Sequence, residues 1–386
     1  MDNLLIKSTI AICTIVIGFA SFIFLLNRQL PFSDIARGQI KRIIAIFFLL
    51  GAGSILVALA VLLIPGQWLR PYAVFICLAL IFFLAGEIRF RLQKSKYRGD
   101  HLIQKEPLKF DDCRFRARES NIFERAQPIT TMDLDIYKFE VAVAMKAVSA
   151  AGTLKVISMS DFHIHPNLPF CYYEAVIDQA NQEEPDLVFL PGDFVTDLDH
   201  SAGLEILLSR IKARYGVFAT LGNHDYWAGP ETVLRKLENS GVQVATNRCI
   251  KLSLPGHASN LVVMICGNDD PWGENPWKPP DFDAGSLYIM LSHTPDNIYQ
   301  LSRYPFTAIF SGHCHGGQFR IPGFGSIILP SGYGRRFDHG HYVFGSNNMK
   351  QRTHLFVSAG VGVANPALRF YCHPDIFVVN FRISPL

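Results

Sequence analysis

Histidine, aspartate and asparagine residues recur in this chain at the ends of apolar segments, where their side chains could bind metal ions. The segment "SGHCHGGQ" places two histidines one residue apart in a glycine-rich turn directly after "TAIF". Imidazole nitrogens, carboxylates and amide oxygens together suit a pair of hydrolytic divalent ions, with one carboxylate bridging them. A single residue of this kind is more often a cap or a satisfied hydrogen-bonding group, but the ordered series predicts a two-metal site. The series is Asp161 and His163 in "SMSDFHIH", Asp193 in "LPGDF", Asn223, His224 and Asp225 in "LGNHD", His293 in "LSHTPD", and His313 and His315.

Each residue of this series follows an apolar segment of strand-like length. From about residue 129 onward such segments alternate with helical ones, which predicts an α/β domain whose active site lies at strand ends. Helices are expected over 204–215 and over 230–239, the second with Pro230 at its first position. The expected strands are 154–160, 186–193, 215–225, 261–269, 287–293, 307–313, 326–330, 355–360 and 376–381.

The ordered motifs, and the ending "THLFVSAGVGVANPALRFYCHPDIFVVNF", resemble the calcineurin-like metallophosphoesterases, and most of all a bacterial membrane-associated branch. The resemblance runs from about Leu154 to Phe381. It implies a four-layer αββα sandwich, two mixed sheets flanked by helices, and a phosphoester hydrolase that uses two divalent ions such as Mn²⁺, Fe²⁺ or Zn²⁺. Carried over by position, one ion would be bound by Asp161, His163, Asp193 and His315, and the other by Asp193, Asn223, His293 and His313.

The same resemblance implies that His224 is the catalytic histidine. The two ions would neutralise the phosphate oxygens and activate a hydroxide for attack, while protonated His224 assists the leaving group. Asp225 is expected to support its loop. Many relatives have a second acid where this chain has Thr196, followed by Asp197, so the carboxylate that orients His224 stays open.

Three further residues have open roles. His165 stands where relatives frequently have a small residue, and an exposed turn histidine is favoured over a substrate contact. Arg335 and Arg336 are candidates for phosphate or headgroup contacts, with solvated surface arginines equally favoured.

Three apolar segments near the start of the chain are long enough to predict transmembrane helices: roughly Ser8–Leu26, Ile43–Leu69 and Pro71–Gly86. The third is short and can extend past Glu87, and buried core helices are the less favoured alternative. With 49% hydrophobic residues, the chain can hold both a membrane segment and a large core. Residues 1–100 contain 11 Lys and Arg against 4 Asp and Glu. This basic excess lies beside the apolar segments, where it would contact lipid headgroups or set the topology, and it does not predict a nucleic-acid-binding face.

Lysine and arginine counts in the short loops predict a multi-pass cell membrane protein with its catalytic domain on the cytoplasmic face. Several relatives in the membrane-associated branch work outside the cytoplasmic membrane, which argues against that face. The eight cysteines contain no CxxC pair and predict neither a disulfide framework nor a zinc ribbon. The six beyond residue 100 are therefore expected to be unpaired and reduced.

These observations divide the chain into 1–98, a transmembrane segment of about three helices, 99–150, a connector with the first covering elements, and 151–386, the metallophosphoesterase domain. The expected function is a membrane-anchored phosphoesterase with two metal ions. Its substrate would be a phosphodiester, pyrophosphate or phosphomonoester, with a lipid or lipid-linked compound as an attractive candidate. The alternative is a catalytically silent membrane sensor or receptor that keeps the metal site as a structural staple. A transporter is less favoured, because the apolar segments lack internal charged residues.

Overall fold

The computed structural model describes residues 2–29, 53–63, 65–118, 127–255, 261–345 and 352–386. The chain forms two compact units, which are described separately. The first comprises Met1–Tyr97 with Pro330–Arg336, and the second Arg98–Leu329 with Phe337–Leu386.

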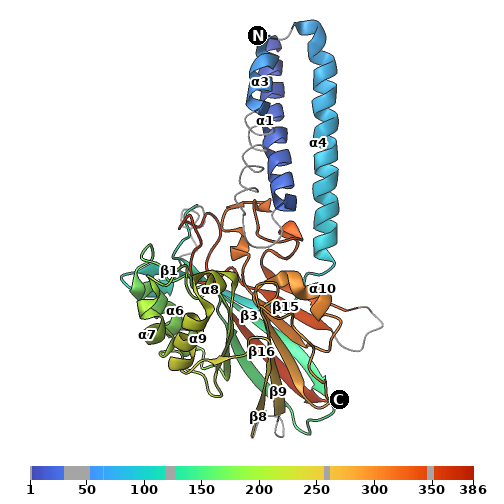
Figure 1. The fold of residues 1–386 in the computed structure, drawn as a ribbon. Helices are drawn as coiled ribbons and strands as arrows, with labels where there is room; N and C mark the ends of the chain where they lie inside the picture. The colour runs from blue at the N-terminus through green and yellow to red at the C-terminus, as the bar shows by residue number, and fades with distance from the viewer. Residues whose placement is uncertain (1, 30–52, 64, 119–126, 256–260, 346–351) are drawn as a thin grey trace. The chain divides into compact units, whose positions relative to one another are not determined.

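The first unit is built from apolar helices (Figure 1). Its helices are α1 (Asp2–Gln29), α3 (Gly53–Leu63) and α4 (Gly66–Ser95). Pro71–Ser95 is long and apolar enough to cross a membrane, judged by length and composition, whereas Leu4–Phe19 and Ser54–Leu63 are shorter apolar helices. A small cluster of Ile10, Val61 and Ile76 packs inside this unit.

The boundaries of these helices differ from the predicted ones. The predicted segment 43–69 is not one helix, because α3 ends at Leu63 and α4 begins at Gly66, immediately after Pro65. Proline has no N–H to donate and does not continue a helix, which explains the break. Residues 43–52 and 64 lie outside the described residues. Helix α4 continues past Glu87, as the sequence had allowed.

The second unit contains two mixed β-sheets that pack face to face (Figure 1). The larger sheet has the strand order β2-β1-β3-β16-β4-β5-β6-β7, and the smaller has the order β14-β15-β11-β10-β9-β8. Strands β4, β5 and β6 are mutually parallel, as are β9, β10, β11 and β15.

The bounds of the larger sheet are β1 Leu102–Asp111, β2 Arg114–Ala117, β3 Leu134–Met145, β4 Gly152–Ser158, β5 Leu187–Pro191, β6 Val217–Thr220, β7 Gln243–Val244 and β16 Asp375–Pro385. Those of the smaller sheet are β8 Cys249–Leu254, β9 Leu261–Asn268, β10 Leu287–Ser292, β11 Ala308–Ser311, β14 Gly340–Phe344 and β15 Thr353–Val357. A two-stranded sheet pairs β12 (Arg320–Ile321) with β13 (Gly325–Ser326). The α-helices are α6 Phe170–Gln182, α7 Leu204–Leu208, α8 Asn223–Ala228, α9 Pro230–Asn239 and α10 Ile298–Leu301, and short 3₁₀ helices cover 201–203, 295–297, 315–317 and 334–337.

Two hydrophobic clusters hold this sandwich together. One lies between the sheets and includes Phe189, Phe310 and Phe377, and the other joins the larger sheet to α6, α7 and α9. Burial of apolar surface at about 25 cal/mol per Å² makes such clusters the main stabilising term. They fix the sheets relative to each other, and hence the strand ends that carry the polar series.

The structure confirms eight of the nine expected strands, and α9 matches the expected helix 230–239. The expected strand 326–330 is wrong, because only Ser326 of that segment pairs, within β13. The helix expected over 204–215 ends at Leu208. Residues 99–150 contribute β1, β2 and β3, three of the eight strands of the larger sheet. A fourth layer over the smaller sheet stays a prediction.

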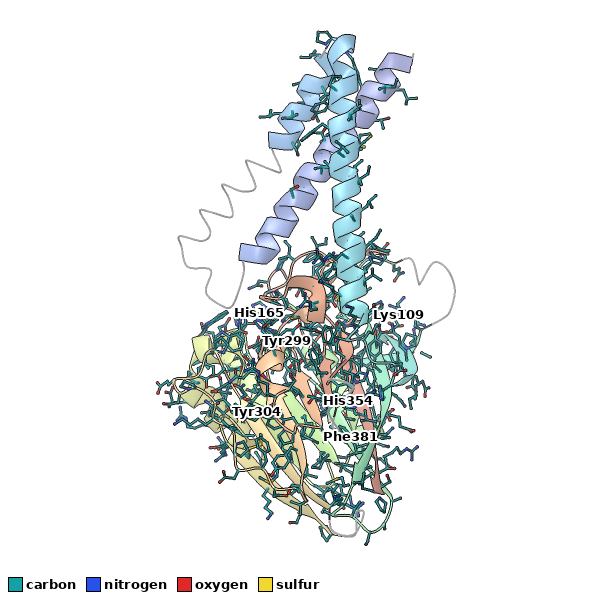
Figure 2. All side chains as sticks on the ribbon, turned by 90° about the vertical axis from the view of Figure 1, so that its right-hand side faces the viewer. Lys109, His165, Tyr299, Tyr304, His354 and Phe381 are labelled. Carbon is teal, nitrogen blue, oxygen red and sulfur yellow. A yellow bond between two sulfur atoms is a disulfide. The ribbon has the colours of Figure 1, made fainter. Side chains whose placement is uncertain are left out.

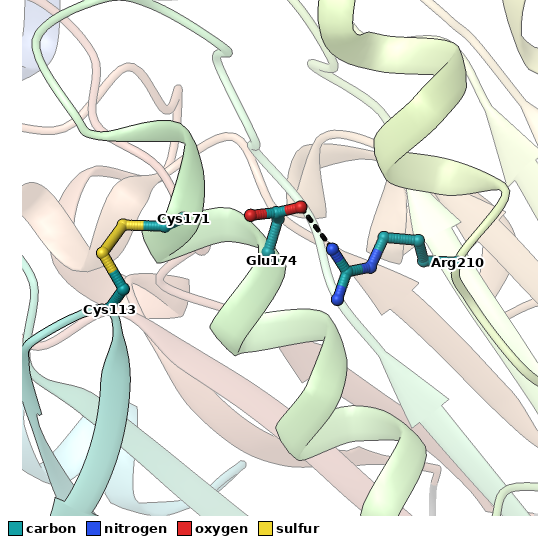
Figure 3. The surroundings of a disulfide bond; sticks show 4 residues. All are labelled: Cys113, Cys171, Glu174 and Arg210. Atoms are coloured by element: carbon teal, nitrogen blue, oxygen red, sulfur yellow. Dashed lines mark hydrogen bonds and ion pairs between the residues drawn. A yellow bond between two sulfur atoms is a disulfide. The ribbon is translucent and has the colours of Figure 1, made fainter.

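The expectation that all cysteines beyond residue 100 are unpaired is wrong. Cys113, in the turn between β1 and β2, is bonded to Cys171 in the first turn of α6 (Figure 3). Cys249 and Cys266 are directly opposite each other on β8 and β9 and form the second disulfide. The bonded cysteines are 58 and 17 residues apart in the sequence. Only the folded chain brings them together, and no short sequence motif indicates the pairing.

Candidate metal centre

The predicted site residues follow strands whose carboxyl ends lie side by side. Asp161 and His163 follow β4, Asp193 follows β5, and Asn223 and His224 begin α8 directly after β6. From the smaller sheet, His293 follows β10 and the pair His313 and His315 follows β11. Parallel strands end at the same edge of a sheet, so the polar residues of each sheet lie along one edge. Because the two sheets pack face to face, the polar residues of both sheets lie close together.

Four side chains form the first group, Asp161, His163, Asp193 and His315, whose ligand atoms lie within 4.8 Å of one another. The Nε2 atoms of His163 and His315 are 3.0 Å apart, and Asp161 Oδ1 is 3.3 Å from His315 Nε2. All four residues are buried. Two carboxylates and two imidazoles at this spacing form a donor set for one divalent ion.

Asp193 also belongs to a second group, with His293 and His313. Its Oδ2 atom is 3.1 Å from His293 Nε2 and 3.4 Å from His163 Nε2, so one carboxylate oxygen faces both groups. The Nδ1 atom of His293 is 2.6 Å from the carbonyl oxygen of Pro191. A proton on Nδ1 leaves the Nε2 lone pair for a metal ion, the usual way in which a backbone carbonyl orients a ligand histidine.

Asn223 supplies the test of whether this pocket suits metal ions. Its Oδ1 atom is buried and accepts no hydrogen bond within the part of the chain that the structure describes. A buried acceptor without a partner costs about 1–3 kcal/mol, so its retention needs an explanation. The next residue, His224, donates its backbone N–H to Asp193 Oδ1, so Asn223 adjoins a residue that contacts the shared carboxylate. An amide oxygen is a suitable ligand for a divalent ion, and the donor set therefore fits.

The backbone of these residues is strained. Asp161, His163, Asp193, His313 and His315 all have positive φ angles, between 43° and 65°. Non-glycine residues in this left-handed region each cost about 1–3 kcal/mol, and such residues cluster at functional sites. Close backbone approach adds to this constraint, since a Cβ atom on Gly312 would lie 2.1 Å from Asp161 Oδ2.

Burial and neighbouring charges shift the pKa values of the acidic and imidazole groups in this pocket in opposite directions. Burial acts to raise the pKa of Asp193, but the imidazoles of His293 and His163 hold it well below its ordinary value. Burial acts to lower the pKa of His293, yet Asp193 outweighs it and raises this pKa to about 9. Burial also lowers the pKa of His315 and raises that of Asp161. In the absence of ions, His293 and Asp193 thus form a buried ion pair.

His224 lies beside the first group. Its ring meets that of His163 edge to face, with centroids 4.6 Å apart, and packs on Trp227 with centroids 4.7 Å apart. Burial lowers the pKa of His224 to about 4, although Asp193 acts in the opposite direction. The ring is therefore neutral at pH 7 without a bound anion, and an acid role requires a phosphate charge next to it.

Asp225 joins the loops that carry the candidate ligands, in agreement with the supporting role expected for it. Its carboxylate accepts hydrogen bonds from the backbone N–H groups of Asp193, Phe194 and Gly222, at 2.8, 2.9 and 2.9 Å. These contacts join the loop after β5 to the loop after β6. Burial and the charge of Asp193 raise the pKa of Asp225 to about 7.

Arg369 was not singled out by the sequence analysis, although it lies in the quoted "RFYC" ending. Its side chain is fully buried and donates to the carbonyl oxygens of Ala359 and Gly362, each at 2.6 Å, and to that of His315 at 3.3 Å. The backbone N–H of Gly362 in turn donates to the carbonyl oxygen of Asp161. Arg369 thus holds the candidate ligand His315 directly, and Asp161 through Gly362, by contacts to the backbone.

Trp272 was also missed. Its ring lies 5.1 Å from that of His313 and 5.6 Å from that of His293, centroid to centroid. Nothing in the local sequence "DDPWGE" marks it, because its position depends on the fold of the loop after β9.

The remaining candidates lie elsewhere. Asp197 accepts from His200 at 2.6 Å, and His165 lies with these two in a more exposed group. Arg335 and Arg336 belong to the first unit, where Arg335 pairs with Glu87 and Arg336 donates to Gln93. Arg335 also lies over the ring of Phe90, so it connects 330–336 to α4. The thiol of Cys314, between His313 and His315 in the chain, belongs to neither ligand group among the described residues.

Comparison with known proteins gives consistent results. Residues 154–317 match the calcineurin-like phosphoesterase family. The chain is 31% identical over 239 residues to the uncharacterised metallophosphoesterase YkuE of Bacillus subtilis, covering 59% of this chain and 79% of that protein. It is 29% identical to the phosphodiesterase YaeI of Escherichia coli, covering 60% and 83%. It is 25% identical to the UDP-2,3-diacylglucosamine pyrophosphatase LpxG of Chlamydia muridarum, covering 60% and 84%.

Proposed function

Because this chain belongs to the calcineurin-like metallophosphoesterase family, we propose that it hydrolyses a phosphodiester or pyrophosphate bond at a centre of two divalent ions. The observation that carries the proposal is the position of Asp193, whose Oδ2 atom lies 3.1 Å from His293 and 3.4 Å from His163. A carboxylate shared by two groups of imidazoles suits a bridging ligand. The chain is a metal-dependent phosphoester hydrolase by family, and the roles of its individual residues are our proposal.

In this proposal one ion is held by Asp161, His163, Asp193 and His315, and the other by Asp193, Asn223, His293 and His313. Oxygen and imidazole donors without thiolate suit Mn²⁺, Fe²⁺ or Zn²⁺. When bound, two such ions neutralise phosphate oxygens and lower the pKa of coordinated water.

His224 is the catalytic histidine of the proposal. Its ring packs against His163 and Trp227 and is fixed in orientation before substrate arrives. An anionic phosphate next to the ring raises its pKa from about 4, so that it gains a proton on substrate binding. It then donates that proton to the leaving oxygen, a step that contributes about 10²–10⁴-fold to the rate.

The substrate we favour is a phosphoester or pyrophosphate in a lipid or lipid-linked compound. The apolar first unit supports this choice, since α4 is long enough to hold the chain in a membrane. In a multi-pass anchor, the shorter apolar helices α1 and α3 would accompany it. The relative LpxG is named as a pyrophosphatase of UDP-2,3-diacylglucosamine, which carries acyl chains. YaeI is named as a phosphodiesterase.

For the side of the membrane, we propose the oxidising face and not the cytoplasmic one. The lysine and arginine counts favour the cytoplasm, but the argument from reduced cysteines no longer supports it, because two disulfides are present. Stable disulfides are rare in the cytosol, whereas the charge rule is a statistical bias. The disulfides therefore support the oxidising face.

A metal-reconstituted activity screen tests the function. The full chain in detergent is stripped of metal, loaded with Mn²⁺, Fe²⁺ or Zn²⁺, and assayed with bis-p-nitrophenyl phosphate, p-nitrophenyl phosphate and lipid diphosphates. We expect turnover that depends on the added ion and is absent from Asp193→Asn. A chain that binds both ions and hydrolyses none of these compounds would favour the catalytically silent sensor instead.

A further inference from the structure

Three histidines outside the candidate metal centre gather between the two sheets of the second unit. His101 lies just before β1, His341 lies in β14 and His354 in β15 (Figure 2 labels His354). One ring nitrogen from each lies within 4.8 Å of the others. The group shares no residue with the two groups around Asp193.

The three rings are in contact with one another. His341 and His354 are stacked, with an interplanar angle of 2°, and Nε2 of His341 is 3.0 Å from Nδ1 of His354. The ring of His101 stands edge-on to both, with centroid distances of 4.9 Å to each. His341 and His354 lie on the paired strands β14 and β15, and His101 joins them from a segment distant in sequence.

The hydrogen bonds of this cluster leave buried nitrogen atoms without partners. Within the described residues, Nδ1 of His101 and Nδ1 of His341 are buried and make no hydrogen bond. Asp100 Oδ1 is 3.3 Å from His101 Nδ1, but the side chain of Asp100 is fully exposed. Nδ1 of His341 lies beside the backbone of Gly99, because a Cβ atom on that residue would be 2.0 Å from it. Desolvated polar atoms without partners are costly, so a merely structural role leaves Nδ1 of His101 unexplained.

The backbone holds this arrangement through Gly99 and His101. The Gly99 N–H donates to the carbonyl oxygen of His341 at 2.9 Å, and the carbonyl oxygen of His101 accepts from Glu140 N–H at 3.0 Å. A Cβ atom on residue 99 would lie 2.0 Å from His341 Nδ1, so only glycine lets the chain pass this close to the ring. His101 is thereby brought next to both strands.

We propose that His101, His341 and His354 bind one transition-metal ion of the zinc type, distinct from the ions of the phosphoesterase centre. Tetrahedral bonds of 2.0–2.1 Å to imidazole nitrogen place ligand atoms about 3.3 Å apart, close to the 3.0 Å between His341 and His354. Three imidazoles without a carboxylate select Zn²⁺, Co²⁺ or Cu²⁺ over Mg²⁺ or Ca²⁺. The fourth position is left for water on the side of His101, which is the partly exposed member.

Such an ion would connect the larger sheet to the edge of the smaller one. His101 begins the segment that adds β1 and β2 to the larger sheet, and β14 is an edge strand of the smaller sheet. An ion bound only by the folded chain stabilises it by mass action. The site is therefore expected to be a structural clamp, not a second catalytic centre.

The test counts Zn²⁺ bound to the full chain in detergent by equilibrium dialysis, in the Asp193→Asn background, where the phosphoesterase centre is disabled. We expect the Asp193→Asn chain to keep one Zn²⁺, bound at the three histidines. The additional change His101→Gln should weaken the binding of this ion at least about 100-fold, since even an outer-shell change costs 10–100-fold. Co²⁺ in place of Zn²⁺ should give a tetrahedral visible spectrum that the same change removes. His101→Asn serves as the second variant if His101→Gln folds poorly by circular dichroism.

The matched control is His200→Gln, which removes an exposed histidine of the group with His165 and Asp197. It should leave both the Zn²⁺ count and the Co²⁺ spectrum unchanged. Equal Zn²⁺ binding with and without His101, or a loss caused by His200→Gln instead, would overturn the assignment. Because the single variant His101→Gln should keep its Mn²⁺-dependent hydrolysis, failure of this inference is distinguishable from failure of the proposed function.

Discussion

The backbone N–H of His224 donates a hydrogen bond of 2.9 Å to Oδ1 of Asp193. This contact occupies one carboxylate oxygen and leaves Oδ2 to face His163 and His293. The proposed bridging ligand and the proposed proton donor are therefore positioned by the same interaction. The effects of substituting Asp193 and His224 on metal binding and turnover should therefore be compared.

Removal of the charge of Asp193 should empty both ligand groups. Asp193→Asn keeps the shape of the side chain and its backbone contact, but a neutral amide cannot bridge two cations as a carboxylate does. We expect markedly less bound metal, measured by plasma mass spectrometry of dialysed protein, and no turnover. Wild-type turnover in this variant would contradict the two-metal proposal.

His224→Ala separates proton donation from metal binding. We expect most of the metal to be retained and kcat to fall by about 10²–10⁴-fold for alkyl esters, whose leaving group needs a proton. The loss should be smaller for p-nitrophenyl esters, because p-nitrophenolate leaves without protonation. Equal losses for both ester classes would exclude the acid role.

Metal binding should depend on pH through His293. Its pKa of about 9 means that this ring is protonated at pH 7 in the metal-free chain, and a ligand must be neutral to bind. Below pH 9 the affinity for one ion should therefore rise about tenfold per pH unit. Calorimetric titration in buffers of different ionisation enthalpy should show a proton released on binding. Affinity that does not change between pH 6.5 and 8.5 would contradict this interpretation.

Arg369 should act on stability and on positioning, not on chemistry. Arg369→Met removes the donors that satisfy the carbonyl oxygens of Ala359 and Gly362, and each buried carbonyl left unpaired costs about 1–3 kcal/mol. The carbonyl oxygen of His315 keeps its hydrogen bond from the N–H of Gln318. We expect the free energy of unfolding to fall by several kcal/mol in denaturant titrations, together with weaker metal binding. The control is Arg382→Met, at an exposed arginine paired with Glu140, which should change stability by about 0.5 kcal/mol or less. Equal effects of the two changes on the free energy of unfolding would contradict a stabilising role for the buried hydrogen bonds of Arg369.

The sequence predicted the polar series because each of its members follows a β-like segment, a pattern that is local in the chain. Most of the expected strands were found for the same reason, since apolar segments such as 187–191 and 287–292 are buried on both faces. The parts it did not predict depend on contacts between distant segments. Arg369 reaches His315 across 54 residues, and Cys113 pairs with Cys171 across 58. The strand expected at 326–330 failed because an apolar segment alone does not show whether a pairing partner exists.

The disulfide of Cys113 and Cys171 should stabilise the second unit. It closes a loop with a sequence separation of 58, and such cross-links contribute typically about 2–4 kcal/mol by restricting the unfolded chain. We expect Cys113→Ser, Cys171→Ser and the double variant to lower the free energy of unfolding by similar amounts. Cys77→Ser, at an exposed free cysteine, is the control and should have little effect. Four reactive thiols, and not eight, should be counted in unfolded protein without reductant.

The last prediction concerns the face of the membrane on which the second unit works. The basic residues Arg89, Arg91, Lys94, Lys96 and Arg98, just after the apolar part of α4, favour the cytoplasm. The two disulfides favour an oxidising compartment, because cytosolic thiols are kept reduced. A reporter fused after Leu386 in a bacterial host distinguishes the two. We expect a periplasmic phosphatase reporter to be active and a fluorescent reporter that folds only in the cytoplasm to be dark. An inactive phosphatase reporter with a fluorescent cytoplasmic reporter would place the second unit on the cytoplasmic face. Eight reactive thiols in freshly lysed cells would then show that the cysteine pairs do not oxidise there.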